Sequence, residues 1–322
     1  MSPTVSGPQS LDPRAIRPAV PPDLQGVLQV RQAQELSESG TVFTTADQLA
    51  AEWEALGSRL AEHVWVAVAA DGSLIACVEL HREGEVFSPC LWALPDRRDS
   101  ELEMALLATS ERRAWASARD EGAHSVTLFA QATSTHPTAQ QALQQSGFVI
   151  TSTYEQMELA LTEPPSLPDL LPGIEIRPFV VGQDDAAVLH RADEEAFLDQ
   201  RDHTPRAFEQ WTQRLNLSGK TFDPSLWLIA WDADEVAGAA LGEIIEDAGW
   251  IHHLFVRRPW RRRGLGAALT LSAVGAFYQH GIGAVRLNVD AQSLTNAHQL
   301  YRRVGFRVIS AYANYEKVTP LA

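Results

Sequence analysis

The stretch RRPWRRRGLGAALT, from Arg257 to Thr270, combines five arginines with a glycine-rich turn and a following apolar segment. Gly264 and Gly266 allow a tight turn because they carry no Cβ atom, and small apolar residues then recur at helical spacing. The pattern predicts a loop that opens a helix, whose first N–H groups lack partners and whose dipole attracts anions. We interpret the stretch as a seat for a pyrophosphate group. It has neither the Lys-Ser/Thr pair of a P-loop nor the G-x-G-x-x-G spacing of a dinucleotide fold.

The composition restricts the possible partners. The 322 residues carry a formal net charge of −15, and no interleaved aromatics or further basic stripes flank the arginine run, so we expect no nucleic-acid partner. Cys77 and Cys90 show no metal-ligand spacing and fit a reducing compartment, so we expect no bound metal. No apolar run reaches the roughly 18 residues of a membrane span, and no signal-peptide pattern opens the chain. The sequence predicts a cytoplasmic protein without a membrane partner, as a monomer or homodimer.

The chain repeats itself at an offset of about 160 residues. The segment AIRPAV recurs as EIRPFV, VAVAADGSLIACVEL resembles LIAWDADEVAGAALG, and QQSGFVITSTYEQMEL pairs with RRVGFRVISAYANYEK. Since the period is the size of a domain, we expect two tandem copies of one fold. The expected division is a disordered tail (1–13), a first copy (14–162), a proline-rich linker (163–173) and a second copy (174–322).

The second copy has a mixed order of elements. A short strand (174–179) and a helix (184–199) come first, and Thr204 is expected to cap another helix that starts at Pro205. Two strands around a polar turn follow, and then the strand GWIHHLFV, the helix after the glycines, the strand AVRLNV, the helix TNAHQLYRRV and a last strand from Phe306. This order predicts an α/β fold with a mixed sheet.

With these elements in place, Arg261 to Gly266 fits the R/Q-x-x-G-x-G/A signature of the GNAT N-acetyltransferase superfamily, and the preceding HLFV and the downstream LYRRVGF match it too. The tandem layout most resembles mycothiol synthase and related two-copy acetyltransferases. The resemblance implies acetyl-CoA as co-substrate and a small-molecule amine as acceptor. It implies the following cofactor-binding residues: Leu254, Phe255, Val256, Arg261, Arg262, Arg263, Gly264, Leu265, Gly266, Ala267 and, at the start of the last helix, Asn296, which could equally be a cap.

The same resemblance places a tyrosine on the last helix as proton donor to the leaving thiolate, which is Tyr301 here. Many family members carry a glutamate base on the central strand, but the matching residue is Trp250, which cannot accept a proton. His252 lies two residues on, on the same expected face, and is our candidate base. His253 is expected on the opposite face in a structural role. Glu243 and Glu246 are fallback bases acting through water, and the acidic run from Asp193 to Asp202 is expected either to wall the acceptor cleft or to be solvated.

The first copy lacks the signature. PDRRDSELEMALL replaces the glycine-rich segment, so Asp99, Ser100 and Glu101 stand where a pyrophosphate would bind. Counting back from Gly147 places Leu143 at the position of Tyr301. We therefore expect a degenerate first copy and one active site, in the second copy.

Two other functions remain open from the sequence. The second copy could be an acyltransferase with another acyl group or acceptor, or it could sense acyl-CoA without turnover. A proton donor such as Tyr301 favours an enzyme over a sensor.

Overall fold

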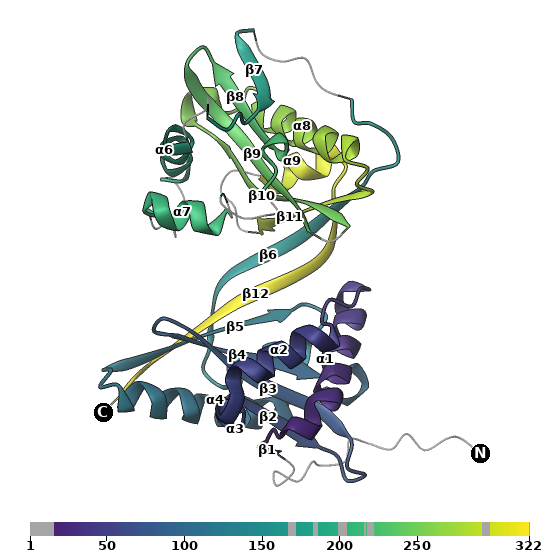
Figure 1. The fold of residues 1–322 in the computed structure, drawn as a ribbon, viewed down its shortest axis with the longest axis vertical. Helices are drawn as coiled ribbons and strands as arrows, with labels where there is room; N and C mark the ends of the chain where they lie inside the picture. Colours follow the sequence, from purple (N-terminus) through teal and green to yellow (C-terminus); the bar gives the residue numbers. More distant parts are fainter. Residues whose placement is uncertain are drawn as a thin grey trace, which may run out of the picture. The chain divides into compact units, whose positions relative to one another are not determined.

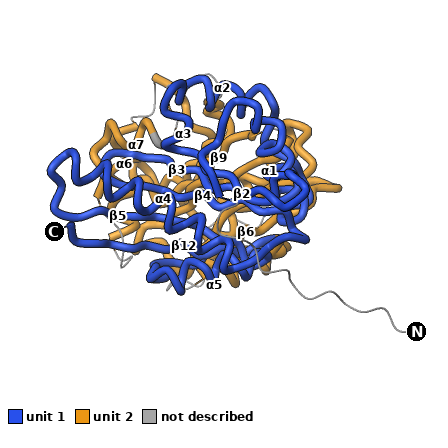
Figure 2. The backbone as a smooth tube through the Cα atoms, turned by 90° about the horizontal axis from the view of Figure 1, so that it is seen from below, with its two compact units in different colours: residues 1–153, 310–322 blue, residues 154–309 orange. Residues whose placement is uncertain are grey.

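The computed structural model describes residues 16–166, 172–182, 186–198, 205–215, 217, 222–245, 247–291 and 297–321. The chain forms two compact units: unit 1 holds the residues up to Thr153 together with those from Ser310 onward, and unit 2 holds Tyr154–Ile309 (Figure 2). The residues expected to form the N-terminal tail, and residues 167–171 of the expected linker, lie outside the described ranges.

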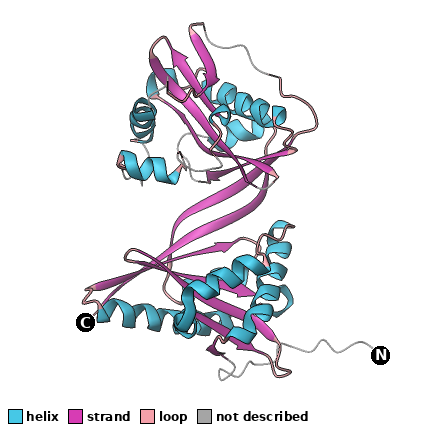
Figure 3. Cartoon of the chain, viewed as in Figure 1, coloured by secondary structure: helices cyan, strands magenta, loops and turns pink. Residues whose placement is uncertain are grey.

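Unit 1 is a mixed sheet with helices on both faces (Figures 1 and 3). Its strands run in the order β1-β2-β3-β4-β5-β12. The strands are β1 (Ile16–Pro18), β2 (Val64–Val68), β3 (Leu74–Glu83), β4 (Val86–Ala93), β5 (Ser125–Thr133) and the C-terminal β12 (Arg307–Pro320). The helices are α1 (Leu24–Ser39), α2 (Ala46–Leu56), α3 (Leu60–His63), α4 (Ser100–Asp120) and α5 (Pro137–Gln145).

Unit 2 repeats this plan with the strand order β6-β11-β10-β9-β8-β7. The strands are β6 (Val149–Ala160), β7 (Ile174–Pro178), β8 (Trp227–Asp232), β9 (Glu235–Ile245), β10 (Ala248–Val256) and β11 (Ala284–Asp290). The helices are α6 (Ala186–Phe197), α7 (Phe208–Arg214), α8 (Leu265–Gln279) and α9 (Ala297–Val304). Short 3₁₀ turns complete the two units: η2 (Pro21–Asp23), η3 (Gly57–Arg59), η4 (Pro95–Arg97), η5 (Pro224–Leu226) and η6 (Arg258–Trp260).

The predicted α/β class and the order of elements are confirmed. The predicted start of α7 is wrong. The helix begins at Phe208 with the extended Ala207 before it, so Pro205 is not its first residue, and Thr204 lies outside the described residues. Trp211, the most buried residue of that helix at 2% exposed, makes the apolar contact that sets where the helix packs.

Each sheet has two apolar faces because its strand residues alternate between them. In unit 1, Val64 and Val66 of β2 pack toward α1 and α2, whereas Trp65 and Ala67 pack with α4 and α5. In unit 2, one cluster lies with α6 and α7 and the other with α8 and α9. In unit 1 the sheet thus has α1 and α2 on one face and α4 and α5 on the other. In unit 2 the sheet has α6 and α7 on one face and α8 and α9 on the other.

The last strands of the two sequence copies are exchanged. β6 ends the first copy, yet its residues Tyr154–Ala160 pair with β11 of unit 2. β12 ends the second copy, yet its residues Tyr312–Pro320 pair with β5 of unit 1. The compact units therefore differ from the sequence division into 14–162 and 174–322 at these strands. The exchange is possible because the two strands repeat one sequence pattern, so each fits the other's place in a sheet.

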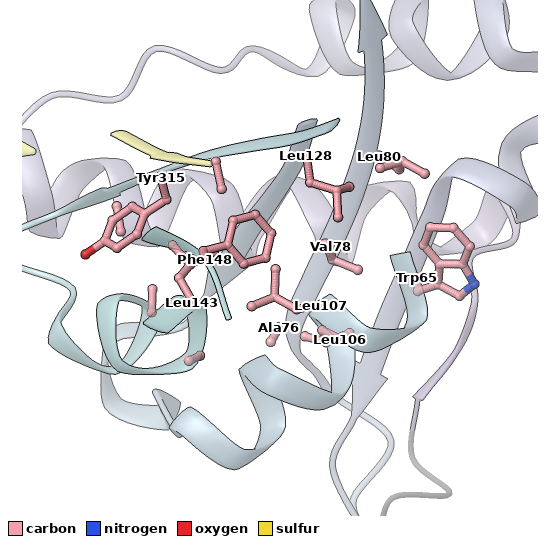
Figure 4. Close-up of a cluster of buried hydrophobic side chains, with 14 of the residues drawn as sticks. Trp65, Ala76, Val78, Leu80, Leu106, Leu107, Leu128, Leu143, Phe148 and Tyr315 are labelled. Carbon is pink, nitrogen blue, oxygen red and sulfur yellow. The ribbon is translucent and has the colours of Figure 1, made fainter. Parts of the chain in front are cut away.

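Tyr315 of the C-terminal strand β12 is part of the hydrophobic core of unit 1. Its side chain is fully buried in the unit 1 core with Leu143 and Phe148 (Figure 4). Burying a large apolar side chain contributes about 1.5–3 kcal/mol, so β12 supplies core packing as well as a ladder of backbone bonds.

Two features are absent from the residues that the structure describes. No helix there is long and apolar enough to cross a membrane. Those residues also contain no group of three or more His, Cys, Asp or Glu side chains placed to hold a metal ion.

Candidate functional site

The central strands of unit 2 part halfway along their length. β10 pairs in parallel with β11 only from Gly249 to Ile251, whereas its antiparallel pairing with β9 continues to Val256. Arg257 donates its N–H to Ala237 on β9. Because N–H groups alternate in direction along a strand, those of Val256 and Leu254 point to the opposite side, where β11 offers no residue in register. This opening can receive the backbone-like amides of an extended ligand.

The start of α8 follows the opening. Gly264 precedes the helix with φ +87°, a left-handed conformation that suits glycine, and Arg262 has φ +62°. Ala268 is the first residue of the helix whose N–H bonds back, to the carbonyl of Gly264. The N–H groups of Leu265, Gly266 and Ala267 are therefore left for an anion, at the positive end of the helix dipole.

The two glycines of the signature have different tasks. A Cβ atom on Gly264 would meet nothing within 4 Å, so this position is open and its glycine is required by backbone angle. A Cβ atom on Gly266 would lie 2.9 Å from Leu300 Cδ1, so this glycine allows α8 and α9 to approach closely. Of the two glycines, Gly264 is therefore the one with open space over it.

The arginines of the loop have two different settings. Arg261 donates from Nε to the carbonyl of Val256 at 2.8 Å and from Nη2 to that of Ala196 at 2.6 Å, which ties the end of β10 to α6. Arg262 and Arg263 are exposed beside the helix start. The side chain of Leu265 is buried in the core, so its N–H is the group that this residue can offer a ligand.

Tyr301 lies on α9 in the cluster that packs α8 against the sheet. It is 6% exposed, and its ring meets that of Phe306 edge to face at 5.9 Å between centroids. Burial raises the pKa of its phenol above the ordinary value of 10, so the group is protonated at neutral pH and can donate. Asn296 lies outside the described residues, so its predicted role stays a prediction.

A β-bulge sets the direction of the two histidines of β10. A Cβ atom on Gly249 would contact Phe277 of α8, and Ile251 belongs to the same cluster, so Trp250 and His252 face the other side. The rings of Trp250 and His252 stack at 6.0 Å with an interplanar angle of 11°.

The pairing with β9 then skips from Ile251 to His253. The extra residue shifts the alternation, so His253 also faces α6. The expectation that His253 points to the opposite face is wrong for this reason.

His253 is held by a buried carboxylate that the sequence reasoning did not assign to it. Its Nε2 lies 2.9 Å from both carboxylate oxygens of Asp193 on α6. Asp193 is 2% exposed and also accepts a hydrogen bond from Trp211 Nε1 at 2.7 Å. A carboxylate at Nε2 favours the tautomer that carries its proton there, which leaves Nδ1 as a proton acceptor. The one signal in the sequence was the acidic run that begins at Asp193.

His252 has a more open setting. Its side chain is 39% exposed, and its Nε2 lies 3.6 Å from Glu243 Oε2. Glu243 stands opposite Trp250 in the register of β9 and β10. Glu246, the other fallback base, lies outside the described residues. The sheet face toward α6 thus presents two imidazoles and an indole from β10 and a carboxylate from β9 beside the strand opening.

In unit 1, backbone N–H groups at the corresponding positions are hydrogen-bonded to side chains of the same unit. Ala93 ends β4 as Val256 ends β10, and its N–H donates to the side-chain Oε1 of the buried Gln34 at 2.8 Å. At the start of α4, Asp99 Oδ1 accepts the N–H of Glu101 at 2.9 Å. Side chains of this unit therefore bind groups that in unit 2 are left for a ligand.

Buried side chains also tie the start of α5 to α4 in unit 1. Glu103 of α4 is 1% exposed, lies 2.8 Å from His136 Nε2 and accepts a hydrogen bond from Thr138 at 3.0 Å. These contacts support the expectation of a degenerate first copy.

A mixed sheet whose central strands part beside a glycine-capped helix start defines unit 2 as an acetyltransferase fold of the GNAT type. The acetyltransferase (GNAT) domain family matches residues 190–318. A GCN5-related N-acetyltransferase from Sphaerobacter thermophilus is 30% identical with a TM-score of 0.76, over 97% of this chain and 98% of that one. The chain belongs to the GCN5-related N-acetyltransferase family.

Two further comparisons concern the tandem arrangement and the relatives. A tandem GNAT protein from the clavulanic acid biosynthesis pathway shares the fold at a TM-score of 0.63 and 14% identity, over 95% of this chain and 99% of that one. The mycothiol acetyltransferase of Streptomyces scabiei is 32% identical over 53% of this chain and 55% of its own length. That of Streptomyces avermitilis is 32% identical over 62% and 60%. The chain spans only about half to three fifths of these curated relatives.

Proposed function

We propose that the protein is an acetyl-CoA-dependent N-acetyltransferase. Unit 2 holds the active site, where the amine of a small molecule is acetylated. The observation that carries the proposal is the strand opening between β10 and β11 at the start of α8, with His253 beside it. The opening offers amide groups to a pantetheine chain, and the helix start offers N–H groups to a pyrophosphate. The membership of the family supports this function, and the mycothiol acetyltransferase relatives support a small-molecule acceptor.

Each step of an acetyl transfer has a candidate group in unit 2. The N–H groups of Leu254 and Val256 are oriented to polarise the thioester carbonyl as negative charge develops on its oxygen. His253 accepts the proton that the amine loses, and Asp193 orients the imidazole and stabilises it once charged. Tyr301 gives its proton to the leaving thiolate. His252, with Trp250 and Glu243, lines the acceptor side of β10.

The function is tested by incubating the protein with acetyl-CoA and a broad panel of amines and following the release of free thiol. We expect amine-dependent release with at least one class of amine and the matching acetylated product by mass spectrometry. Tight binding of acetyl-CoA without release across the panel would instead favour an acyl-CoA sensor.

We predict one tight acetyl-CoA site per chain. Gln34 and Asp99 occupy backbone N–H groups of unit 1 whose counterparts in unit 2 are left for the ligand. Isothermal titration of the whole protein with acetyl-CoA should give a stoichiometry near one. Two sites of similar affinity would contradict the degeneracy of unit 1.

Replacement of Tyr301 by Phe tests the proton donor. The turnover number should fall by about 10²-fold, because the ring is kept and only the acidic hydroxyl is lost. The affinity for acetyl-CoA and the thermal midpoint should change little, since the hydroxyl acts mainly in the transition state. Tyr278→Phe on the exposed side of α8 is the matched control and should keep full activity. Equal turnover in parent and Tyr301→Phe would leave Tyr301 as a core residue.

A further inference from the structure

Unit 1 carries a cluster of ionisable side chains that the proposed acetyl transfer does not use. Cys90 of β4 lies directly opposite Glu79 of β3, and His81 follows two residues along β3 on the same face. His81 Nε2 is 3.7 Å from Glu79 Oε2, and Cys90 stands diagonally across from His81 in the register of β3 and β4, with its Sγ 4.0 Å from the carbonyl oxygen of Ser88. A thiol, an imidazole and a carboxylate therefore converge on the sheet face toward α1.

The cluster combines a buried ion pair with two side chains that solvent can reach. Glu79 and Arg31 of α1 form an ion pair with side chains only 4% and 7% exposed, and Arg31 also binds Glu52 of α2 at 3.0 Å. His81 is 56% exposed at the side chain, and Cys90 is half-buried. The pair fixes the carboxylate beneath the imidazole, while the thiol and imidazole can still be reached from solvent.

Cys90 occupies the position in unit 1 that His253 occupies in unit 2. Each stands three residues before the end of its strand, at Ala93 or Val256, and each faces the first long helix of its unit. β4 pairs with β5 only at Val86 and Phe87, so Cys90 also lies beside a parting of strands. In unit 1 the N–H group of Ala93 at the opening is thus bound by Gln34, and a free thiol lies beside it.

We propose that Cys90 and His81 form a thiol–imidazole pair, a covalent-modification site at which the Cys90 sulfur attacks small uncharged electrophiles. In this step the sulfur forms a bond to the electrophilic carbon. The bond between that carbon and its leaving group breaks, and the leaving group departs with the electron pair. The thiol proton passes to solvent, and the His81 imidazolium, which Glu79 holds in place, stabilises the thiolate that attacks.

The charges that face the pair favour a thiolate beside an imidazolium. The neighbouring Cys90, followed by Glu79, raises the pKa of His81 to about 10, so His81 is an imidazolium at neutral pH. Arg31 faces the cluster from α1, and Glu52 faces Arg31 from α2.

Cys77 provides an internal comparison for the reactivity of Cys90. Cys77 lies on the neighbouring strand β3 and is fully buried, and burial raises the pKa of its thiol well above the ordinary value.

Alkylation of the intact protein with iodoacetamide at pH 6.5 tests the pair, with each cysteine followed by peptide mass spectrometry. We expect carbamidomethylation of Cys90 at least about tenfold faster than that of Cys77. His81→Asn should slow the reaction of Cys90 by about tenfold and make its rate rise more steeply with pH, because the cation that stabilises the thiolate is lost. His81 is exposed, so this variant should fold.

His124→Asn is the matched control, since His124 is an exposed histidine of the same unit away from the cluster. Its rate at Cys90 should equal that of the parent. The proposal is overturned if Cys90 reacts no faster than Cys77, or if His81→Asn leaves the rate and its pH dependence unchanged.

Discussion

His253→Asn should lower the turnover number by about 10³-fold, within the range of 10² to 10⁴ that general base catalysis supplies. The substitution keeps a polar side chain of similar reach beside Asp193 but removes the proton acceptor. The affinity for acetyl-CoA should change little, because the imidazole lies on the acceptor face of β10 and the cofactor groups lie at the opening and helix start. Steady-state kinetics with an accepted amine, together with acetyl-CoA titration, measures both quantities.

The neighbouring histidine provides the control for this experiment. His252→Asn changes the same residue type on the same strand, and we expect less than about a tenfold loss, since the His252 side chain is 39% exposed and the neighbouring Glu243 carboxylate is itself 27% exposed. A much larger loss for His252→Asn than for His253→Asn would transfer the base role to His252. Equal stability of the two variants, measured by thermal unfolding, keeps the comparison free of folding effects.

Gly264→Glu should raise the dissociation constant of acetyl-CoA by about 10³-fold or more. The new carboxylate stands at the open position over Gly264 and repels a pyrophosphate there. The left-handed backbone at φ +87° adds strain for any residue with a Cβ atom, about 1–2 kcal/mol. Titration of the folded variant with acetyl-CoA measures the loss.

Gly281→Glu separates the charge effect from the strain. Gly281 follows the other end of α8 with φ +75°, and a Cβ atom there also meets nothing within 4 Å. The substitution imposes similar backbone strain in the same unit but places the carboxylate far from the helix start, so acetyl-CoA affinity should be kept. If Gly264→Glu folds and binds acetyl-CoA as the parent does, the helix start is not the pyrophosphate seat.

Local patterns in the sequence determined most of the architecture. The repeat at a domain-sized offset indicated two copies of one fold, and the two units do have matching strand orders. The glycines after Arg263 predicted a turn into a helix, and α8 begins directly after Gly264. Such signals can be read from one segment at a time, because backbone freedom and helical spacing are properties of neighbouring residues.

The tertiary structure decided what depends on residues far apart in the chain. Because β6 and β12 carry the same pattern, nothing local specifies which sheet each one joins, and they are found exchanged. A single bulge at His252 reverses the alternation of β10 and turns His253 toward Asp193, 60 residues away. Likewise, Gln34 reaches the N–H of Ala93 from a helix 59 residues earlier in the sequence. Alternation along a strand predicts which sheet face each side chain takes only while the strand pairing stays regular. The hydrogen-bond partners of buried polar groups depend on which segments pack together. These features of the site were therefore decided by the tertiary structure.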